Sequence, residues 1–144
     1  MEFTVKRFDE LSIHELYEIL KARAEVFVEE QKITCADPDG IDRECLHCMM
    51  WENGELMAYM RAYVYDDNIL KIGRVLTRTR GKGHGALLMK NGIPEIKRIF
   101  GCERVIVSAQ IQAEGFYRAM GFARVSEEYL EENVPHVKME LQNI

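Results

Sequence analysis

The segment Val75–Leu88 carries the residues best suited to hold an anion. It places Gly-Lys-Gly-His-Gly between an apolar run typical of a strand and a run typical of a helix. Glycines let a backbone approach a ligand closely, and the free N–H groups of a first helical turn point at an anion. Arg78, Arg80 and Lys82 add positive charge. The segment therefore predicts a phosphate-binding loop.

The glycine spacing narrows the kind of phosphate ligand. The P-loop pattern G-x-x-x-x-G-K-[ST] is absent, and the spacing is G-x-G-x-G where a dinucleotide fold has G-x-G-x-x-G. Arg80, Gly83 and Gly85 instead match R-x-x-G-x-G/A, which resembles the acyl-CoA pyrophosphate loop of the GNAT acetyltransferases. The alternative for this motif taken alone is a simple glycine turn between a strand and a helix.

A second segment strengthens the resemblance. Residues 113–122 read Ala-Glu-Gly-Phe-Tyr-Arg-Ala-Met-Gly-Phe and are similar to the GNAT pattern A-x-x-F-Y-x-x-x-G-F. Tyr117 lies where that family places its general acid. Its alternative role is that of an amphipathic core residue beside Phe116. Gln110 stands where family members often have Asn.

The two ends of the chain resemble the ElaA-like subgroup of that family. Arg23–Gln31 is similar to R-x-x-V-F-V-x-E-Q, and Val134–Met139 is similar to I-P-H-x-x-M. The chain is thus identified as a suspected ElaA-like GNAT protein. The resemblance implies a mixed α/β fold, with six or seven strands splayed between the fourth and fifth and helices on both faces. It also implies acetyl-CoA as cosubstrate, with pantetheine entering the splay, and one GNAT domain over residues 1–144.

The resemblance further implies direct attack of a neutral amine on the thioester. Backbone N–H groups at about Val75 and Leu76 would polarise the carbonyl. Tyr117 would protonate the departing thiolate, because a phenol with a pKa near ~10 can donate to a thiolate that it hydrogen-bonds. The residues expected to hold the cofactor are Val75, Leu76, Arg80, Gly81, Lys82, Gly83, His84, Gly85, Ala86 and Gln110.

The base and the acceptor contacts are assigned from residue type and position. Glu29 and Glu30 end the first predicted helix and could deprotonate the amine, or could be solvated charges at a helix end. His136 could be a base, but behind a proline it is better suited to binding substrate. Arg23 and Phe27 are further candidates for substrate binding. Arg23 would orient an acceptor carboxylate or pair internally with Glu29 or Asp42.

These residues require an alternation of strands and helices. The sequence predicts a strand at residues 3–6, a helix at 12–31 begun by a Ser-x-x-Glu capping box, and a polar loop at 32–44. An antiparallel meander should follow over residues 45–77, with a turn at Asn53-Gly54. The remaining predictions are a helix from Gly83, kinked or broken at Gly92 and Pro94, and elements at 104–108 (strand), 112–120 (helix), 122–129 and 136–141 (strands).

Composition limits the partners. The chain has 144 residues, 47% of them hydrophobic, and a net charge of −5, so we expect one folded domain and no nucleic-acid partner. Without an apolar span or a signal peptide, we expect no membrane partner and a cytoplasmic location. Cys45, His47 and Cys48 could suggest zinc, but they read better as part of a strand, and no metal is expected.

Two other functions stay open on the sequence. An acyl-homoserine-lactone-synthase-like enzyme shares the Arg23–Phe27 pattern, although such enzymes exceed this chain in length. A non-catalytic acyl-CoA sensor would keep the glycine loop without turnover. The expected acceptor is a small-molecule amine, a peptide amine or a protein lysine, with the acidic composition slightly favouring a cationic one. We expect a monomer or a homodimer.

Overall fold

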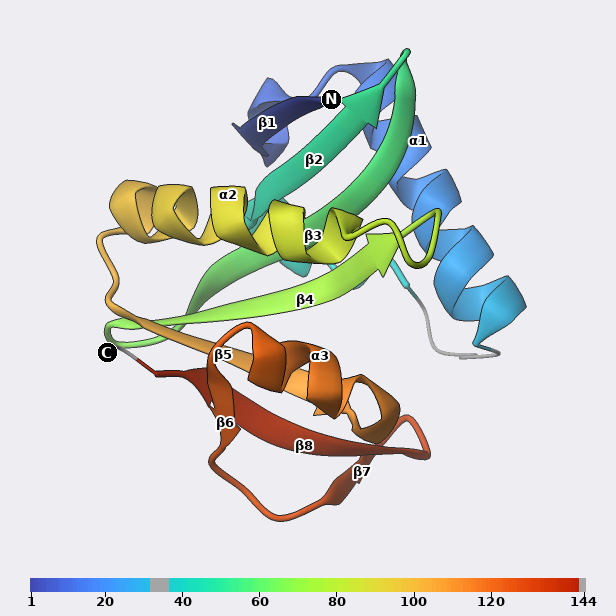
Figure 1. The fold of residues 1–144 in the computed structure, drawn as a ribbon. Coiled ribbons are helices and arrows are strands. Elements are labelled where there is room, and N and C mark those ends of the chain that lie inside the picture. Colours follow the sequence, from blue (N-terminus) through green and yellow to red (C-terminus); the bar gives the residue numbers. More distant parts are fainter. Residues whose placement is uncertain (32–36, 143–144) are drawn as a thin grey trace.

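The computed structural model describes residues 1–31 and 37–142. Within them, eight strands form one sheet in the order β1-β2-β3-β4-β5-β8-β6, with β7 paired to β8 (Figure 1). The strands are β1 (Glu2–Arg7), β2 (Leu46–Glu52), β3 (Glu55–Asp66), β4 (Ile69–Thr77), β5 (Arg104–Gln110), β6 (Phe122–Arg124), β7 (Tyr129–Glu131) and β8 (Val134–Leu141). The helices are α1 (Ile13–Arg23), which continues as a π-helix (Ala24–Glu30), α2 (His84–Phe100) and α3 (Glu114–Ala119).

Tight turns fix the antiparallel meander of β2, β3 and β4. Asn53 and Gly54 have φ angles of 52° and 80°, as a two-residue hairpin with matching twist requires. Asn68 takes a φ of 57° in the next turn. The predicted meander over residues 45–77 is therefore confirmed, with turns at the predicted residues.

The sheet opens between β4 and β5. These two strands pair in parallel from Ile69 opposite Arg104 to Ile72 opposite Val107, and beyond these residues β4 and β5 do not pair with each other. Figure 1 shows them diverging beneath α2 and α3. The splay expected between the fourth and fifth strands is confirmed.

The strand predicted at residues 122–129 is wrong in its extent. It is divided into β6 and β7, which both pair with β8, so the sheet has more strands than the six or seven expected. Polar side chains explain the interruption. The Lys138 N–H of β8 donates to the Ser126 hydroxyl at 2.9 Å, and the side chain of Ser126 donates to the Glu127 carbonyl at 2.9 Å.

Helices cover both faces of the sheet. On one face Ile19 and Ala22 of α1 join a buried cluster with Met49 and Tyr59. On the other face α2 and α3 pack on the larger cluster, which contains Leu46, Cys48, Met50, Met60, Leu88, Met89, Ile96 and Tyr117. Neighbouring residues of one strand enter different clusters because side chains of a strand alternate between its faces. The two faces thus receive separate cores.

The first and second helices differ in how well their limits were predicted. Ser12 caps α1 and exchanges hydrogen bonds with Glu15, which confirms the capping box. Of the two alternatives predicted at Gly92 and Pro94, a kink or a break, the break is wrong, because α2 continues through Pro94 to Phe100. Gly92 allows close packing there: a Cβ atom at this position would lie 2.5 Å from Met60 Cε on β3.

Candidate active site

A cavity of about 420 Å³ lies at the mouth of the splay. Three parts of the chain line it: the end of β4, the glycine loop with the first turn of α2, and the start of α3. The lining residues are Val75, Leu76, Thr77, Thr79, Arg80, Gly81, Gly83, His84, Gly85, Ala86, Ala113, Phe116 and Tyr117. The cavity therefore joins the two segments whose motifs resemble the GNAT family.

The β4 wall offers backbone donors toward the splay. Arg78 N–H donates across to Met57 O of β3 at 2.9 Å. Because successive residues of a strand point their N–H groups to opposite edges, the Thr77 N–H points to the edge that β5 has left. Val75 and Leu76, the predicted polarising positions, both line the cavity, but by the same alternation only the Val75 N–H shares the open edge with Thr77, whereas the Leu76 N–H points to β3.

The glycine loop has the conformation of an anion site. Gly81 and Gly83 take φ angles of 76° and 73°, and Gly83 is the N-cap of α2 without any side-chain cap. The first turn holds no acidic residue. The N–H groups of this turn are thus left to a ligand, with the helix dipole behind them.

Two further observations favour a ligand at this loop. The Nδ1 atom of His84 is buried without a hydrogen-bond partner, a state that proteins rarely leave uncompensated. A Cβ atom at Gly85 would lie 3.1 Å from the Phe116 ring, so the glycine keeps the helix start close to α3. The residues present therefore fit a phosphate-bearing ligand.

The three basic residues near the loop have different positions. Arg78 pairs with Glu25 of the π-helix at 2.8 Å and ties the start of the loop to the first helical segment. Arg80 lines the cavity, and Lys82 lies exposed between the two left-handed glycines. Arg78 is thus engaged with the first helical segment, while Arg80 and Lys82 belong to the loop that borders the cavity.

Tyr117 lies in the wall that α3 contributes. Its ring contacts Phe116 and Phe122 edge to face, with centroids 5.2 Å and 5.5 Å away, and the residue is 7% exposed. Burial raises the pKa of its phenol. The hydroxyl consequently keeps its proton at neutral pH and can act as a donor in this cavity.

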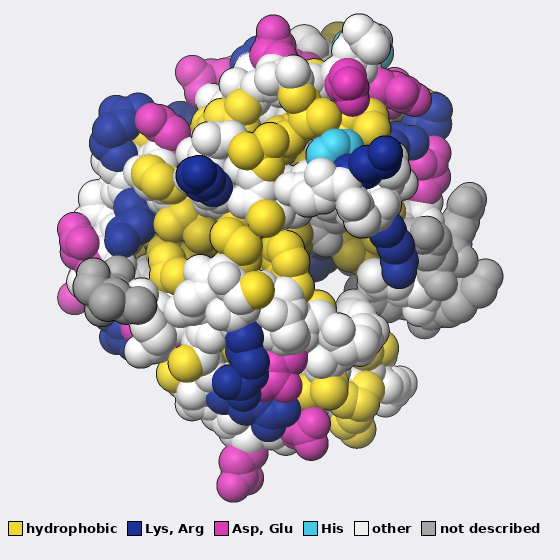
Figure 2. All heavy atoms as spheres, in the orientation of Figure 1, with side chains coloured by type: hydrophobic (Ala, Val, Ile, Leu, Met, Phe, Trp, Pro, Cys, Tyr) yellow, Lys and Arg dark blue, Asp and Glu magenta, His cyan; other side chains and the backbone are white. Residues whose placement is uncertain are grey.

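An apolar groove of about 580 Å³ adjoins the cavity along α2. It shares Gly83 and Ala86 with the glycine loop and runs on past Ile93 to Leu141. Figure 2 shows hydrophobic side chains gathered between α2 and α3, where the surface is hollowed. Lys90 is the charged residue of its lining.

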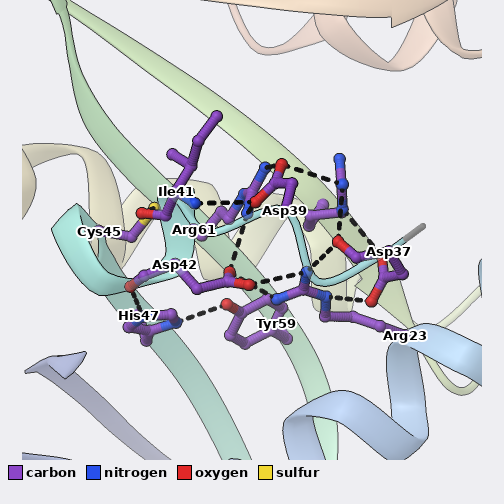
Figure 3. Close-up of polar contacts among 10 residues, drawn as sticks. Arg23, Asp37, Asp39, Ile41, Asp42, Cys45, His47, Tyr59 and Arg61 are labelled. Atoms are coloured by element: carbon purple, nitrogen blue, oxygen red, sulfur yellow. Dashed lines mark hydrogen bonds and ion pairs between the residues drawn. The ribbon is translucent and has the colours of Figure 1, made fainter. Parts of the chain in front are cut away.

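On the face of the sheet that α1 covers lies a cluster of three arginines and three aspartates, of which Figure 3 labels Arg23, Arg61 and the aspartates. We call it the charged cluster; its members are Arg23, Arg61, Arg74, Asp37, Asp39 and Asp42. Its formal charges sum to zero. Arg23 is 0% exposed and Arg61 is 3% exposed, so their charges require these partners.

Asp42 is the centre of the charged cluster. Its carboxylate accepts from Arg23 Nη1 and from Arg61 Nη1, both at 2.8 Å. Burial opposes ionisation, but the hydrogen bonds and charges of the two guanidinium groups outweigh it and lower the pKa of Asp42. Of the two predicted roles of Arg23, the structure therefore contains the internal pairing, and Asp42 is a partner.

A buried histidine continues this cluster toward the core. His47 lies with Nε2 2.9 Å from the Asp42 carbonyl and Nδ1 2.6 Å from the Tyr59 hydroxyl. The carbonyl can only accept, so Nε2 carries the proton and Nδ1 accepts from Tyr59. Burial lowers the pKa of His47, which keeps the ring neutral. This pair is structural packing under the charged cluster.

The remaining predicted site residues lie apart from the cavity. Phe27 packs on the α1 core cluster. Gln110 donates from Nε2 to Gln31 Oε1 at 2.9 Å and so bridges β5 to the end of the π-helix. His136 is buried beside Tyr129, with Nδ1 2.7 Å from the Val134 carbonyl and Nε2 3.5 Å from Glu131.

Glu29 and Glu30 end the π-helix, and their side chains lie outside the described structure. The role of either as a base stays a prediction. The polar loop predicted at 32–44 is described from Asp37, and its end from Ile41 to Glu44 is a 3₁₀ turn.

The sequence interpretation missed most of the charged cluster. The sequence predicts Asp37-Pro38-Asp39-Gly40 as a turn within the polar loop, without a partner for either aspartate, although it supplies two of the three carboxylates. Arg61 was a usable signal, because an arginine within the apolar run of β3 needs a buried partner. The positive φ of Arg74 had no sequence signal.

The Cys-x-His-Cys segment of residues 45–48 is part of β2 and its entry, as predicted. Cys45 and Cys48 are buried, and burial raises the pKa of each thiol to about 12. Among residues 1–31 and 37–142, the structure has no group of three or more side chains placed to ligate a metal ion. In the same residues, none of the helices has the length and apolar character to cross a bilayer.

Comparison with known proteins agrees with this geometry. Residues 16–143 match the family model described as an acetyltransferase (GNAT) domain, so the chain belongs to the GNAT acetyltransferase family. A UPF0039 protein of Schizosaccharomyces pombe is 38% identical over 146 residues, covering 99% of this chain and 97% of that protein. Protein ElaA of Escherichia coli is 36% identical over 136 residues, covering 90% and 89%.

Solved structures extend the same likeness to the fold. An acyl-CoA N-acyltransferase from Pseudomonas aeruginosa superposes with a TM-score of 0.90 at 34% identity, covering 99% of this chain and all of that one. The crystal structure of Escherichia coli ElaA has the same TM-score at 33% identity, with the same coverage. The expected GNAT fold and the expected ElaA-like resemblance are both confirmed.

Proposed function

We propose that this protein transfers an acetyl group from acetyl-CoA to a primary amine. The observation that carries the proposal is the cavity itself, which unites an uncapped helix N-terminus, the open edge of β4 and a protonated tyrosine. Anion binding, carbonyl polarisation and proton donation are the three functions that such a transfer needs.

The cofactor would lie along the cavity with its pyrophosphate at the loop from Arg80 to Ala86. Backbone N–H groups at the start of α2 would donate to phosphate oxygens. The His84 ring would donate to another from Nδ1–H. Pantetheine would follow the β4 edge. The adjoining apolar groove, with Lys90 on its rim, has the chemistry for the adenosine end.

In the reaction, the lone pair of the neutral amine attacks the thioester carbon and the C–S bond breaks. The N–H groups of Val75 and Thr77, on the open edge of β4, would stabilise the negative charge that develops on the carbonyl oxygen. Tyr117 would give its hydroxyl proton to the thiolate, and the proton that the attacking nitrogen loses as the amide forms would pass through water or the base to restore the phenol. Burial raises the pKa of this phenol and makes it a weak acid toward water. It can still donate its proton to the departing thiolate, because the two groups would be directly hydrogen-bonded.

The amine must first lose a proton, since its free pKa lies near ~10. Glu29 or Glu30 is our candidate base, directly or through a water, from their place at the end of the π-helix. His136 is the candidate for contact with the acceptor. Gln110 pairs with His136 across β5 and β8 and bonds to Gln31, so these residues would border the acceptor side.

A screen of amines with acetyl-CoA, read by release of free thiol, tests the proposal. Calorimetry with acetyl-CoA alone should show binding, and at least one amine should accelerate thiol release well above hydrolysis. A chain that binds acetyl-CoA but turns over no amine would instead be an acyl-CoA sensor. Mass spectrometry of the product should show one added acetyl group on nitrogen.

A further inference from the structure

Arg74 has an unusual backbone conformation at an important point of the fold. It takes a φ of 53°, in the left-handed region that side chains other than glycine rarely adopt. The register explains why: β4 uses three residue steps, from Gly73 to Leu76, where β3 uses two, from Arg61 to Tyr59. The extra residue makes a β-bulge, and Arg74 lies in it.

The side chain of Arg74 is held at its far end. Nε donates to Asp37 Oδ1 at 2.9 Å, and Nη2 donates to the Asp37 carbonyl at 3.0 Å and to Asp39 Oδ2 at 3.3 Å. These contacts use the planar, forked donors of a guanidinium, which lysine cannot reproduce. A strained residue persists when its surroundings over-determine it, and these bonds supply that restraint.

The partners of Arg74 are themselves fixed. Asp37 also accepts from Arg23 at 2.9 Å, and Asp39 accepts from Arg61 at 2.7 Å. Arg23 and Arg61 both hold the buried Asp42. Arg74 therefore connects the bulge of β4 to a charged cluster that is anchored on α1 and β3.

The bulge lies immediately before the cavity wall. Pairing of β4 with β5 ends at Ile72, and Val75 follows Arg74 directly and lines the cavity with Leu76. The dihedral angles of Arg74 thus determine how the following peptide groups face the splay. A small rotation there would move their N–H groups away from a carbonyl oxygen.

We propose that Arg74 is a positioning residue for acyl transfer, tethering the β4 bulge to the charged cluster so that the following N–H groups polarise the thioester carbonyl. This inference rests on the proposed function. Because the pyrophosphate loop is a separate segment, loss of the tether should weaken carbonyl polarisation while leaving cofactor affinity nearly unchanged.

The test needs no known acceptor. Acetyl-CoA labelled with carbon-13 at the acetyl carbonyl is bound to the protein, and the carbonyl stretch is read by isotope-edited infrared difference spectroscopy. Hydrogen bonds to the oxygen should lower this frequency in the wild-type complex. Calorimetry with the same ligand gives the affinity, and thermal melts report folding.

Three substitutions separate the tether from the strain. Arg74→Gly accommodates the left-handed φ but removes the side chain that forms the tether. Arg74→Ala removes the tether and does not favour the left-handed φ. Arg74→Lys keeps the positive charge but not the forked guanidinium donors. We expect the band in the glycine and alanine variants to return toward its frequency in free acetyl-CoA, with lysine intermediate. The dissociation constant should stay within about threefold, since the loop still supplies the phosphate contacts.

A matched control is Arg104→Ala. Arg104 makes a two-pronged pair with Glu140, at 3.0 and 2.8 Å, on the exposed side of β5 and β8. The Arg104→Ala variant should give the acetyl carbonyl band at the wild-type frequency. If an acceptor is found, kcat of Arg74→Gly should fall about tenfold to a hundredfold, as small misplacements do, with the KM for acetyl-CoA nearly constant.

The outcomes are distinguishable. A wild-type band in a folded Arg74→Gly variant would overturn the inference and leave the proposed function intact. A wild-type complex whose carbonyl band is not lowered would overturn it equally. Failure of the wild-type protein to bind acetyl-CoA would refute the proposed function, and the inference with it.

Discussion

The glycine loop and the charged cluster are both rich in polar groups, but they differ in how those groups are satisfied. At the loop, α2 begins without a side-chain cap, and the buried Nδ1 of His84 has no partner. In the charged cluster, each of the three carboxylates is held by two arginines. Arg61 Nε is the one buried donor left over among the described atoms of the cluster.

This difference separates binding from support. Buried polar groups that lack partners are costly, so a region that exposes several of them to a cavity is suited to receive a ligand. A region whose charges cancel has little left to offer a substrate. For that reason we assign the loop to the cofactor, and Arg23 to the scaffold that holds the residues around the splay.

The largest expected effect is the loss of acetyl-CoA binding when the glycine loop is disrupted. Replacing Gly83 and Gly85 together with valine should abolish measurable binding of acetyl-CoA by calorimetry. Valine resists the φ of 73° at Gly83, and at Gly85 a Cβ would already press on the Phe116 ring. Both changes displace the N–H groups that we assign to phosphate.

The control for this variant is Gly101→Val. Gly101 ends α2 with a φ of 69° and has open space around it, so valine introduces comparable backbone strain far from the cavity. It should cost stability but preserve binding. Undiminished affinity in the Gly83 and Gly85 double variant would mean that the cofactor does not use this loop.

A second prediction concerns proton donation in the cavity. Tyr117→Phe should lower kcat by ~10²–10⁴, the usual contribution of a general acid, while the affinity for acetyl-CoA changes little. The ring remains to pack against Phe116 and Phe122, so folding should be preserved. Tyr17→Phe, at an exposed position on α1, is the matched control. Wild-type turnover in the Tyr117 variant would make the tyrosine a packing residue.

The features that could be predicted from the sequence also divide between the glycine loop and the charged cluster. The loop, the meander and Tyr117 were predictable, because glycine spacing, Asn-Gly turns and a local motif are read from neighbouring residues. The charged cluster depends on contacts between residues 14 to 37 positions apart, which no local pattern encodes. A break in α2 was one expected alternative because proline lacks an N–H donor and crowds the preceding turn, but the helix runs through Pro94 to Phe100.

The third prediction tests the cluster as a support. Asp42→Asn should reduce the free energy of unfolding by about 3–5 kcal/mol, because it leaves the buried Arg23 and Arg61 short of a counter-charge. Chemical denaturation measures the loss. Affinity for acetyl-CoA, measured on the folded fraction, should stay near that of the wild type if support and binding are separate.

Glu140→Gln is the comparison for this substitution. Its partner Arg104 is half exposed, and exposed pairs contribute only about 0–1 kcal/mol. A similar small loss for Asp42→Asn would show that the charged cluster does not hold the fold. Loss of acetyl-CoA affinity in a folded Asp42 variant would show that the two regions are coupled.

The smallest expected effect is an acid dependence of stability. Arg61 holds the pKa of Asp39 at about 2, below its ordinary value of 3.8, and the pKa of Asp42 is lowered as well. A carboxylate with a lowered folded pKa stabilises the fold above its unfolded pKa, and that stabilisation is lost as pH falls through the folded value. Melting temperature should therefore be level from pH 7 to about 5 and decline between about pH 4 and 2. Because Asp39 is partly exposed, its share should be only about 1 kcal/mol after solvent screening.

Asp39→Asn should make the decline in melting temperature shallower, while Asp67→Asn, on an exposed turn, should leave it unchanged. An equal decline in wild type and Asp39→Asn would mean that this ion pair contributes nothing to stability.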